Sequence, residues 1–158
     1  MRIKIMDIQI VIAILLAYIA WQNYRINEAG FYINKDKLRL DLFERRYKVF
    51  DAFKKMFLSF SIEGRINRDT FSKFIANTSD AEFLFGKEII SYRQEVVDKC
   101  VELMGLERRL ERKGLDVVAL KEIANKMEKL EEWLANQHNR SSKLFSKYLH
   151  FSIDKDPY

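Results

Sequence analysis

The sequence is poor in the residues that build disulfide frameworks and tight turns. Its 158 residues include one cysteine, one proline and five glycines. One cysteine cannot form an internal disulfide, so a disulfide-stapled fold is excluded and a reducing compartment is favoured. The near absence of proline and glycine argues against an architecture of strands and turns. Because 32% of the residues are charged and Leu, Glu, Lys and Arg are frequent, the composition predicts an all-α fold.

Motifs that carry chemistry are also missing. The sequence has no glycine-rich phosphate loop, no metalloprotease-type helix motif and no cysteine pair at metal spacing. One cysteine and two histidines are too few ligands for a structural zinc site. Cys100 falls in an apolar helical stripe and is expected to be a core residue. We therefore expect a protein that is not an enzyme, with no catalytic residues, cofactor, metal or small-molecule substrate.

The sequence does contain one long apolar stretch, Ile5–Tyr24, in which every residue from Ile10 to Trp21 is apolar or aromatic. About 20 residues at about 1.5 Å each span about 30 Å, which is the hydrocarbon thickness of a bilayer. Tyr18, Trp21 and Tyr24 lie three residues apart at its second end, where aromatic rings favour the headgroup layer. The stretch is predicted to be a single transmembrane helix with these three aromatic residues as membrane-interface anchors.

Two other interpretations of this stretch stay open. A secretory signal peptide would also begin with basic residues, although the large side chains around Ala20 make a poor cleavage site. A buried helix of a soluble domain is the second, because the strictly apolar run is only about 12 residues long. More Lys and Arg residues follow the stretch than precede it, which places the C-terminal domain in the cytoplasm and the protein in the inner (plasma) membrane.

The remaining chain is expected to form one helical domain. Residues 25–34, with Gly30 and two asparagines, are predicted to be a hinge or juxtamembrane linker. Residues 35–151 are predicted to be the cytoplasmic domain, and residues 152–158 a frayed tail. The first helix of the domain should end near Gly64. Its apolar face is predicted to consist of Leu38, Leu42, Val49, Phe50, Phe53, Phe57 and Phe60.

Further helices follow from spacing and capping residues. Asn67–Asn77 is predicted to be a short capped helix, and Ala81–Gly86 a turn of helix that tucks inward. Glu88–Arg112 and Val117–Gln137 have regular apolar stripes and are predicted to form an antiparallel helical hairpin. An amphipathic segment, Asn139–Phe151, ends the domain.

One specific contact is suggested by the sequence alone. Arg46 projects from the middle of an apolar helix face, so its guanidinium needs a partner in a folded core. Asp80 and Glu82 are acids that precede an apolar segment which should itself be buried. We therefore predict a structural ion pair between Arg46 and Asp80 or Glu82, with a ligand site at these charges as the alternative.

The net charge of +5 is concentrated after the apolar stretch, where Arg25–Lys55 holds nine Lys and Arg residues against five Asp and Glu residues. Basic residues beside a membrane helix are explained by topology and by attraction to anionic lipid. A basic nucleic-acid-binding protein is an alternative, but helical spacing places the neighbouring Phe residues in a core rather than on a base-stacking surface. No nucleic-acid partner is therefore expected.

Four pieces of text carry a resemblance: AWQNYR at 20–25, KLRLDLFERRYKVFDAFKKMF at 37–57, SDAEFLFGKEI at 79–89 and LFSKYLHF at 144–151. Together they resemble a widespread group of small bacterial membrane proteins that have one N-terminal transmembrane helix and a cytoplasmic helical domain. The resemblance implies this architecture and supplies no activity.

These features predict a non-enzymatic, membrane-tethered helical interaction or scaffold module. Its expected partners are the lipid bilayer and either a second protein or another copy of itself. One alternative is a membrane-active effector, such as a small toxin or defence protein, that acts by oligomerising in the bilayer. The other is the basic nucleic-acid-binding helical protein considered above.

Overall fold

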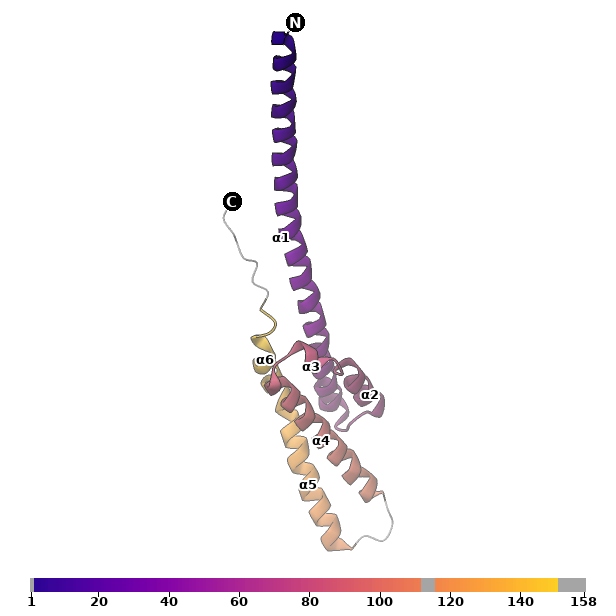
Figure 1. Cartoon of the computed structure of the whole chain (residues 1–158). Helices are drawn as coiled ribbons and strands as arrows, with labels where there is room; N and C mark the ends of the chain where they lie inside the picture. The colour runs from indigo at the N-terminus through magenta and orange to yellow at the C-terminus, as the bar shows by residue number, and fades with distance from the viewer. Residues whose placement is uncertain (1, 112–115, 151–158) are drawn as a thin grey trace. The chain divides into compact units, whose positions relative to one another are not determined.

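The computed structural model describes the backbone of residues 2–111 and 116–150, and the side chains of residues 8–111 and 116–150. The described residues form six helices and no strand, so the fold is all-α as the composition predicts. The predicted frayed tail, 152–158, lies outside the described residues. In chain order the helices are α1 (Arg2–Glu63), α2 (Arg68–Asn77), α3 (Ala81–Leu84), α4 (Lys87–Leu110), α5 (Val117–Ala135) and α6 (Gln137–Ser146) (Figure 1).

The chain divides into two compact units, with the boundary between Asp41 and Leu42. In its described part the first unit consists of α1 alone, and the second contains the rest of α1 and the five other helices. Residues 25–34, predicted to be a hinge or juxtamembrane linker, are helical throughout as part of α1. Glycine inside a helix costs only about 1 kcal/mol, and the segment contains no proline that would break the hydrogen-bond ladder.

The end of α1 follows from Gly64. This residue has φ +66°, a left-handed conformation that glycine adopts without strain, and its N–H donates to the carbonyl of Phe60 at 2.9 Å. Three residues later Asn67 caps α2, since its side-chain oxygen accepts hydrogen bonds from the N–H groups of Asp69 and Thr70. The predicted end of the first helix and the capped second helix are both present.

The core of the second unit is organised around Phe53, which is completely buried. Its ring contacts Phe74 of α2 edge-on at 4.9 Å between centroids, stacks on Tyr92 of α4 at 5.4 Å and lies 5.2 Å from Phe145 of α6. One side chain of α1 therefore joins three other helices. Aromatic pairs of this kind add about 0.5–1.5 kcal/mol each beyond the apolar area that they bury.

The predicted apolar face of α1 is buried only where the second unit covers it. Val49, Phe53, Phe57 and Phe60 are buried and Phe50 is half-buried. Leu38 and Leu42, predicted for the same face, are exposed. Leu38 belongs to the first unit, where α1 is the only described element, and Leu42 is the first residue of the second. Periodicity therefore identified which side of α1 is apolar, but not at which residue of that side burial begins.

Helices α4 and α5 lie side by side and run in opposite directions, as the hairpin prediction requires (Figure 1). Cys100, Leu103 and Leu106 of α4 belong to the same core as Ile123, Leu130 and Leu134 of α5. Asp116 caps α5 by accepting a hydrogen bond from the N–H of Ala119 at 2.7 Å. The connection between the two helices, residues 112–115, lies outside the described residues.

Candidate interaction surfaces

The first candidate surface is the N-terminal part of α1, where apolar side chains face outward on every side of the helix. From Ile8 to Trp21 the exposed large hydrophobic residues are Ile8, Ile10, Val11, Ile12, Ile14, Leu15, Leu16, Tyr18, Ile19 and Trp21. A helix on the surface of a globular domain would have one apolar stripe and one polar face. Within the residues that the structure describes, no helix meets the length and apolarity required to cross a membrane.

The three predicted interface residues lie at the end of this surface and are all exposed. The rings of Tyr18 and Trp21 are 6.1 Å apart between centroids, and the side-chain amide of Gln22 donates to the hydroxyl of Tyr18 at 2.8 Å. The guanidinium of Arg25 lies 5.4 Å from the centre of the Trp21 ring. Aromatic rings beside a cation suit an interface in which one side is apolar and the other is wet and negatively charged.

Arg46 reaches the segment that the sequence predicted, but it contacts different groups. Its Nε donates to the backbone carbonyl of Leu84 at 3.1 Å, and its guanidinium lies 5.3 Å from the ring centre of Tyr148 and 5.9 Å from that of Phe85. The predicted ion pair is therefore replaced by a backbone hydrogen bond and two cation–π contacts.

Helix geometry explains the difference. Asp80 and Glu82 lie at the start of the four-residue helix α3, and both are exposed. Leu84 ends this helix, where carbonyl groups lack partners within the helix and carry partial negative charge. Arg46 of α1 satisfies one of these carbonyls, while the two acids are exposed and Asp80 accepts a hydrogen bond from the hydroxyl of Ser79 at 3.1 Å.

Tyr148 links the C-terminal end of the described chain to the start of α4. Its hydroxyl accepts a hydrogen bond from the N–H of Gly86 at 3.1 Å and donates one to Glu88 at 2.7 Å. Lys147 forms an ion pair with the same carboxylate. The hydrogen bonds from Lys147 and then from Tyr148 lower the pKa of Glu88. No local pattern indicates this junction, because Gly86 and Glu88 are about 60 residues away from Tyr148 in the chain.

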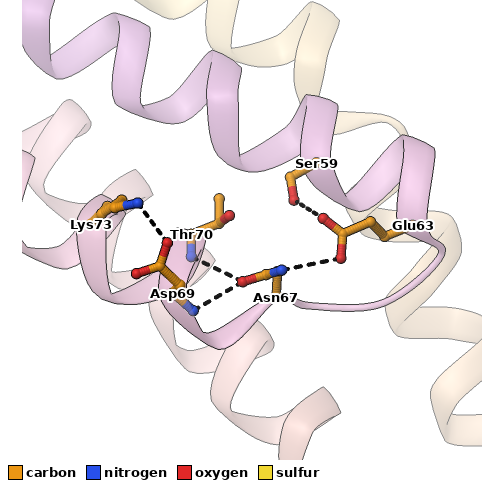
Figure 2. A network of polar contacts seen from close by, with 6 residues as sticks. All are labelled: Ser59, Glu63, Asn67, Asp69, Thr70 and Lys73. Carbon is orange, nitrogen blue, oxygen red and sulfur yellow. Dashed lines mark hydrogen bonds and ion pairs between the residues drawn. The ribbon is translucent and has the colours of Figure 1, made fainter.

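A second network fixes the turn between α1 and α2 (Figure 2). The hydroxyl of Ser59 donates to Glu63 at 2.8 Å, and the other oxygen of Glu63 accepts from the side-chain amide of Asn67 at 3.3 Å. The backbone N–H of Asp69 donates to the side-chain oxygen of Asn67, and the carboxylate of Asp69 forms an ion pair with Lys73 at 2.5 Å. These groups lie within one turn region and satisfy one another, so the network is a structural feature of the turn.

The core of the second unit also contains side chains with polar or titratable groups, among them Thr78 and Cys100. Thr78 is completely buried at the end of α2. Its hydroxyl donates to the carbonyl of Phe74 and accepts from Nε of Arg93, both at 2.8 Å. Cys100 is buried as expected, and burial raises the pKa of its thiol to about 12, so no nucleophilic thiolate forms near neutral pH. Among the described residues no group of His, Cys, Asp or Glu could hold a metal ion.

The far end of the hairpin has a shallow hollow between α4 and α5. Its lining consists of Leu106, Arg109, Ala119, Glu122, Ile123 and Lys126. Beside it Val117 and Val118 are strongly exposed at the start of α5. Nearby, burial raises the pKa of Glu107, and the charges of Arg65 and Arg68 oppose that rise. The side chain of Glu107 is half-buried.

Comparisons with protein-family models, with curated proteins and with solved structures found no match to this chain. The resemblance to small membrane-anchored bacterial proteins therefore stays a prediction from the quoted residues. Function has to be inferred from the chemistry of the surfaces themselves, beginning with the apolar surface at the N-terminal part of α1.

Proposed function

We propose that this protein is a non-enzymatic, membrane-tethered helical module. The N-terminal part of α1 is its anchor in the inner (plasma) membrane, and the unit that begins at Leu42 is a cytoplasmic domain for binding a protein partner or another copy. The observation that carries this proposal is the apolar surface of residues 8–21, which is exposed around the whole circumference of the helix.

The all-round distribution favours lipid over a folded partner as the covering. A single partner would cover one face and leave the other apolar faces in water. Apolar surface left in water forgoes a stabilising free energy of about 25 cal/mol for each Å². Lipid tails cover all faces at once, and the helix satisfies its own backbone hydrogen bonds. The proposed span begins at Ile5; the side chains of Ile5, Met6 and Asp7 lie outside those that the structure describes.

The position of the aromatic residues agrees with this anchor. Tyr18, Trp21 and Tyr24 would lie at the headgroup layer on the cytoplasmic side, with Arg25 next to anionic lipid. The cytoplasmic orientation is supported by the basic residues that follow the span and by the free, buried Cys100, which suits a reducing compartment. The interaction role is supported by exposed apolar residues on the second unit, among them Phe83, Val117 and Val118.

Alkaline carbonate washing of membranes tests the anchor. The full-length protein should stay in the membrane pellet, and a reporter fused after Tyr158 should be active only on the cytoplasmic side. Release of the protein by carbonate would remove the basis of the proposal. A reporter that is active only outside the cytoplasm would leave the anchor in place and reverse its orientation.

Two leucines on α1 provide a matched pair of variants. Leu15 lies near the middle of the proposed span and is 55% exposed, whereas Leu58 lies in the second unit and is 58% exposed. A charge in the middle of a bilayer costs about 3 kcal/mol, so Leu15→Arg should increase the fraction of protein released from membranes. Leu58→Arg introduces the same charge on the same helix and should behave like the parent. Equal release of the two variants would argue against insertion of residues 5–24.

A further inference from the structure

A regular stripe of five aliphatic residues runs along the first unit at intervals of seven. Its members, all exposed, are Ile12, Ile19, Ile26, Ile33 and Leu40. The stripe covers four heptads and about 42 Å of helix at about 1.5 Å per residue. A seven-residue repeat sustained over four heptads is the pattern of a helix that packs along another helix.

The residues three positions further along complete a heptad seam. They are Leu15, Gln22, Ala29 and Asp36, one aliphatic, one small and two polar residues. Gln22 is held by its hydrogen bond to Tyr18, and Asp36 pairs with Arg39 at 3.9 Å. Occasional polar residues in such a seam weaken it but fix the register of the two helices.

A second apolar stripe, Tyr24, Phe31 and Leu38, lies on the opposite side of the helix and is also exposed. The residues three positions after Tyr24 and Phe31 are Asn27 and Asn34, so this side alternates apolar residues with asparagine. The first stripe is better suited to pairing, because four of its five members are isoleucine. In parallel coiled coils, β-branched residues at the first seam position combined with leucine at the second, as at Leu15, favour two strands.

The continuity of α1 is an independent argument for a covering helix. Residues 23–34 contain three asparagines and Gly30, all weak helix formers, and yet they are helical throughout. Most of the stability of a helix in a protein comes from packing of its apolar face. In the described part of the first unit α1 is the only element, and packing against a helix of a second copy would stabilise this segment.

We propose that a second copy of this chain occupies the stripe and forms a parallel, in-register, two-stranded coiled coil along Ile12–Leu40. The proposal rests on the proposed function, since anchors in one membrane hold two copies side by side with the same polarity. A second copy is the occupant that fits best, because it carries the same seven-residue repeat over the same length.

Cysteine crosslinking between copies can test this arrangement. Ile33 is 55% exposed and lies on the seam, whereas Phe31 is 67% exposed and lies on the opposite side. Both residues follow the proposed membrane span, so an oxidant dissolved in water can reach them. Full-length Ile33→Cys and Phe31→Cys would be oxidised in isolated membranes, with the parent as the blank, because the native Cys100 is buried in all three.

Ile33→Cys should form a disulfide-linked dimer at least about fivefold more than Phe31→Cys, because facing seam residues meet in a parallel coiled coil and outer residues do not. Random collision would favour the more exposed Phe31→Cys, so equal or reversed yields would overturn the proposal. A product that links Ile33→Cys to a different protein would also overturn it.

Carbonate washing of the same two variants separates this proposal from the proposed function. Variants that stay in the pellet without seam-specific crosslinking would disprove the coiled coil and leave the anchor intact. Seam-specific crosslinking of protein that carbonate releases would support the coiled coil and disprove the anchor.

Discussion

Replacing Arg46 distinguishes the contact found in the structure from the ion pair expected from sequence. Its guanidinium donates to the carbonyl of Leu84 and lies over the rings of Phe85 and Tyr148. Arg46→Met keeps most of the packing of the aliphatic stem and removes only the charged group. Asp80→Asn and Glu82→Gln remove the charges of the two acids with little change in shape.

The magnitude follows from the contacts. A hydrogen bond from a charged donor contributes about 1.5–3 kcal/mol, and a cation–π contact at an exposed site about 0.5–1 kcal/mol. Arg46 is half-buried, so we take the lower end and expect Arg46→Met to reduce the free energy of unfolding by about 2 kcal/mol. At about 4 °C per kcal/mol for a unit of this size, the midpoint of thermal unfolding should fall by about 8 °C.

The two acids are exposed, so Asp80→Asn and Glu82→Gln should each change the free energy of unfolding by less than about 0.5 kcal/mol. Urea titration of the full-length protein in detergent measures these differences. Trp133 packs against the core of the second unit and reports its unfolding in a Trp21→Phe background. A loss of about 3 kcal/mol or more in an acid variant, matching that of Arg46→Met, would show that a buried ion pair forms and refute the reasoning.

Three further predictions concern the core and the junction at Tyr148. Phe53→Ala should reduce the free energy of unfolding by about 3–5 kcal/mol, because it leaves a cavity in the core where α1 meets three other helices. The control variant Leu58→Ala, at an exposed position, should reduce it by less than about 1 kcal/mol, and urea titration measures both. Gly86→Ala should destabilise the protein by about 1–2 kcal/mol, because the new Cβ would lie 2.7 Å from the Tyr148 hydroxyl. In a double-mutant cycle, Gly86→Ala should cause no such loss when it is made in the Tyr148→Phe variant, which lacks that hydroxyl. Between pH 9 and 10 the free energy of unfolding should fall with rising pH, because the unfolded Cys100 thiol ionises near pH 9 and the buried one only near pH 12. Cys100→Ala should make that slope smaller and leave the part that comes from Tyr92, whose pKa burial also raises; an unchanged slope would mean that the thiol is not buried.

Local signals predicted most of the helices and the face that each one buries. Glycine and asparagine at residues 64 and 67 mark a helix end and a helix start through their own backbone and capping preferences, which need no distant partner. The seven- and four-residue spacing around Phe53 places its face in a core for the same reason. Residues 25–34 are helical despite their weak helix formers, because local helix weakness does not determine whether a longer helix continues through a segment.

The candidate contact site was only partly accessible to such reasoning. That Arg46 needs a partner follows from its place on an apolar helix face, and the sequence also indicated the segment that supplies one. Which group it meets depended on where α3 ends and on the ring of Tyr148, about 100 residues away in the chain. No spacing rule relates residues at that separation.

The sequence by itself determined the all-α class, the apolar stretch that begins at Ile5 and the heptad spacing along α1, since composition and periodicity are properties of neighbouring residues. Only the tertiary structure decided that Phe53 joins α1 to α2, α4 and α6, that Arg46 caps α3 and that Tyr148 closes on Gly86 and Glu88. These contacts join distant parts of the chain, and their geometry is fixed by how side chains of given volume fill one core, which no local pattern contains.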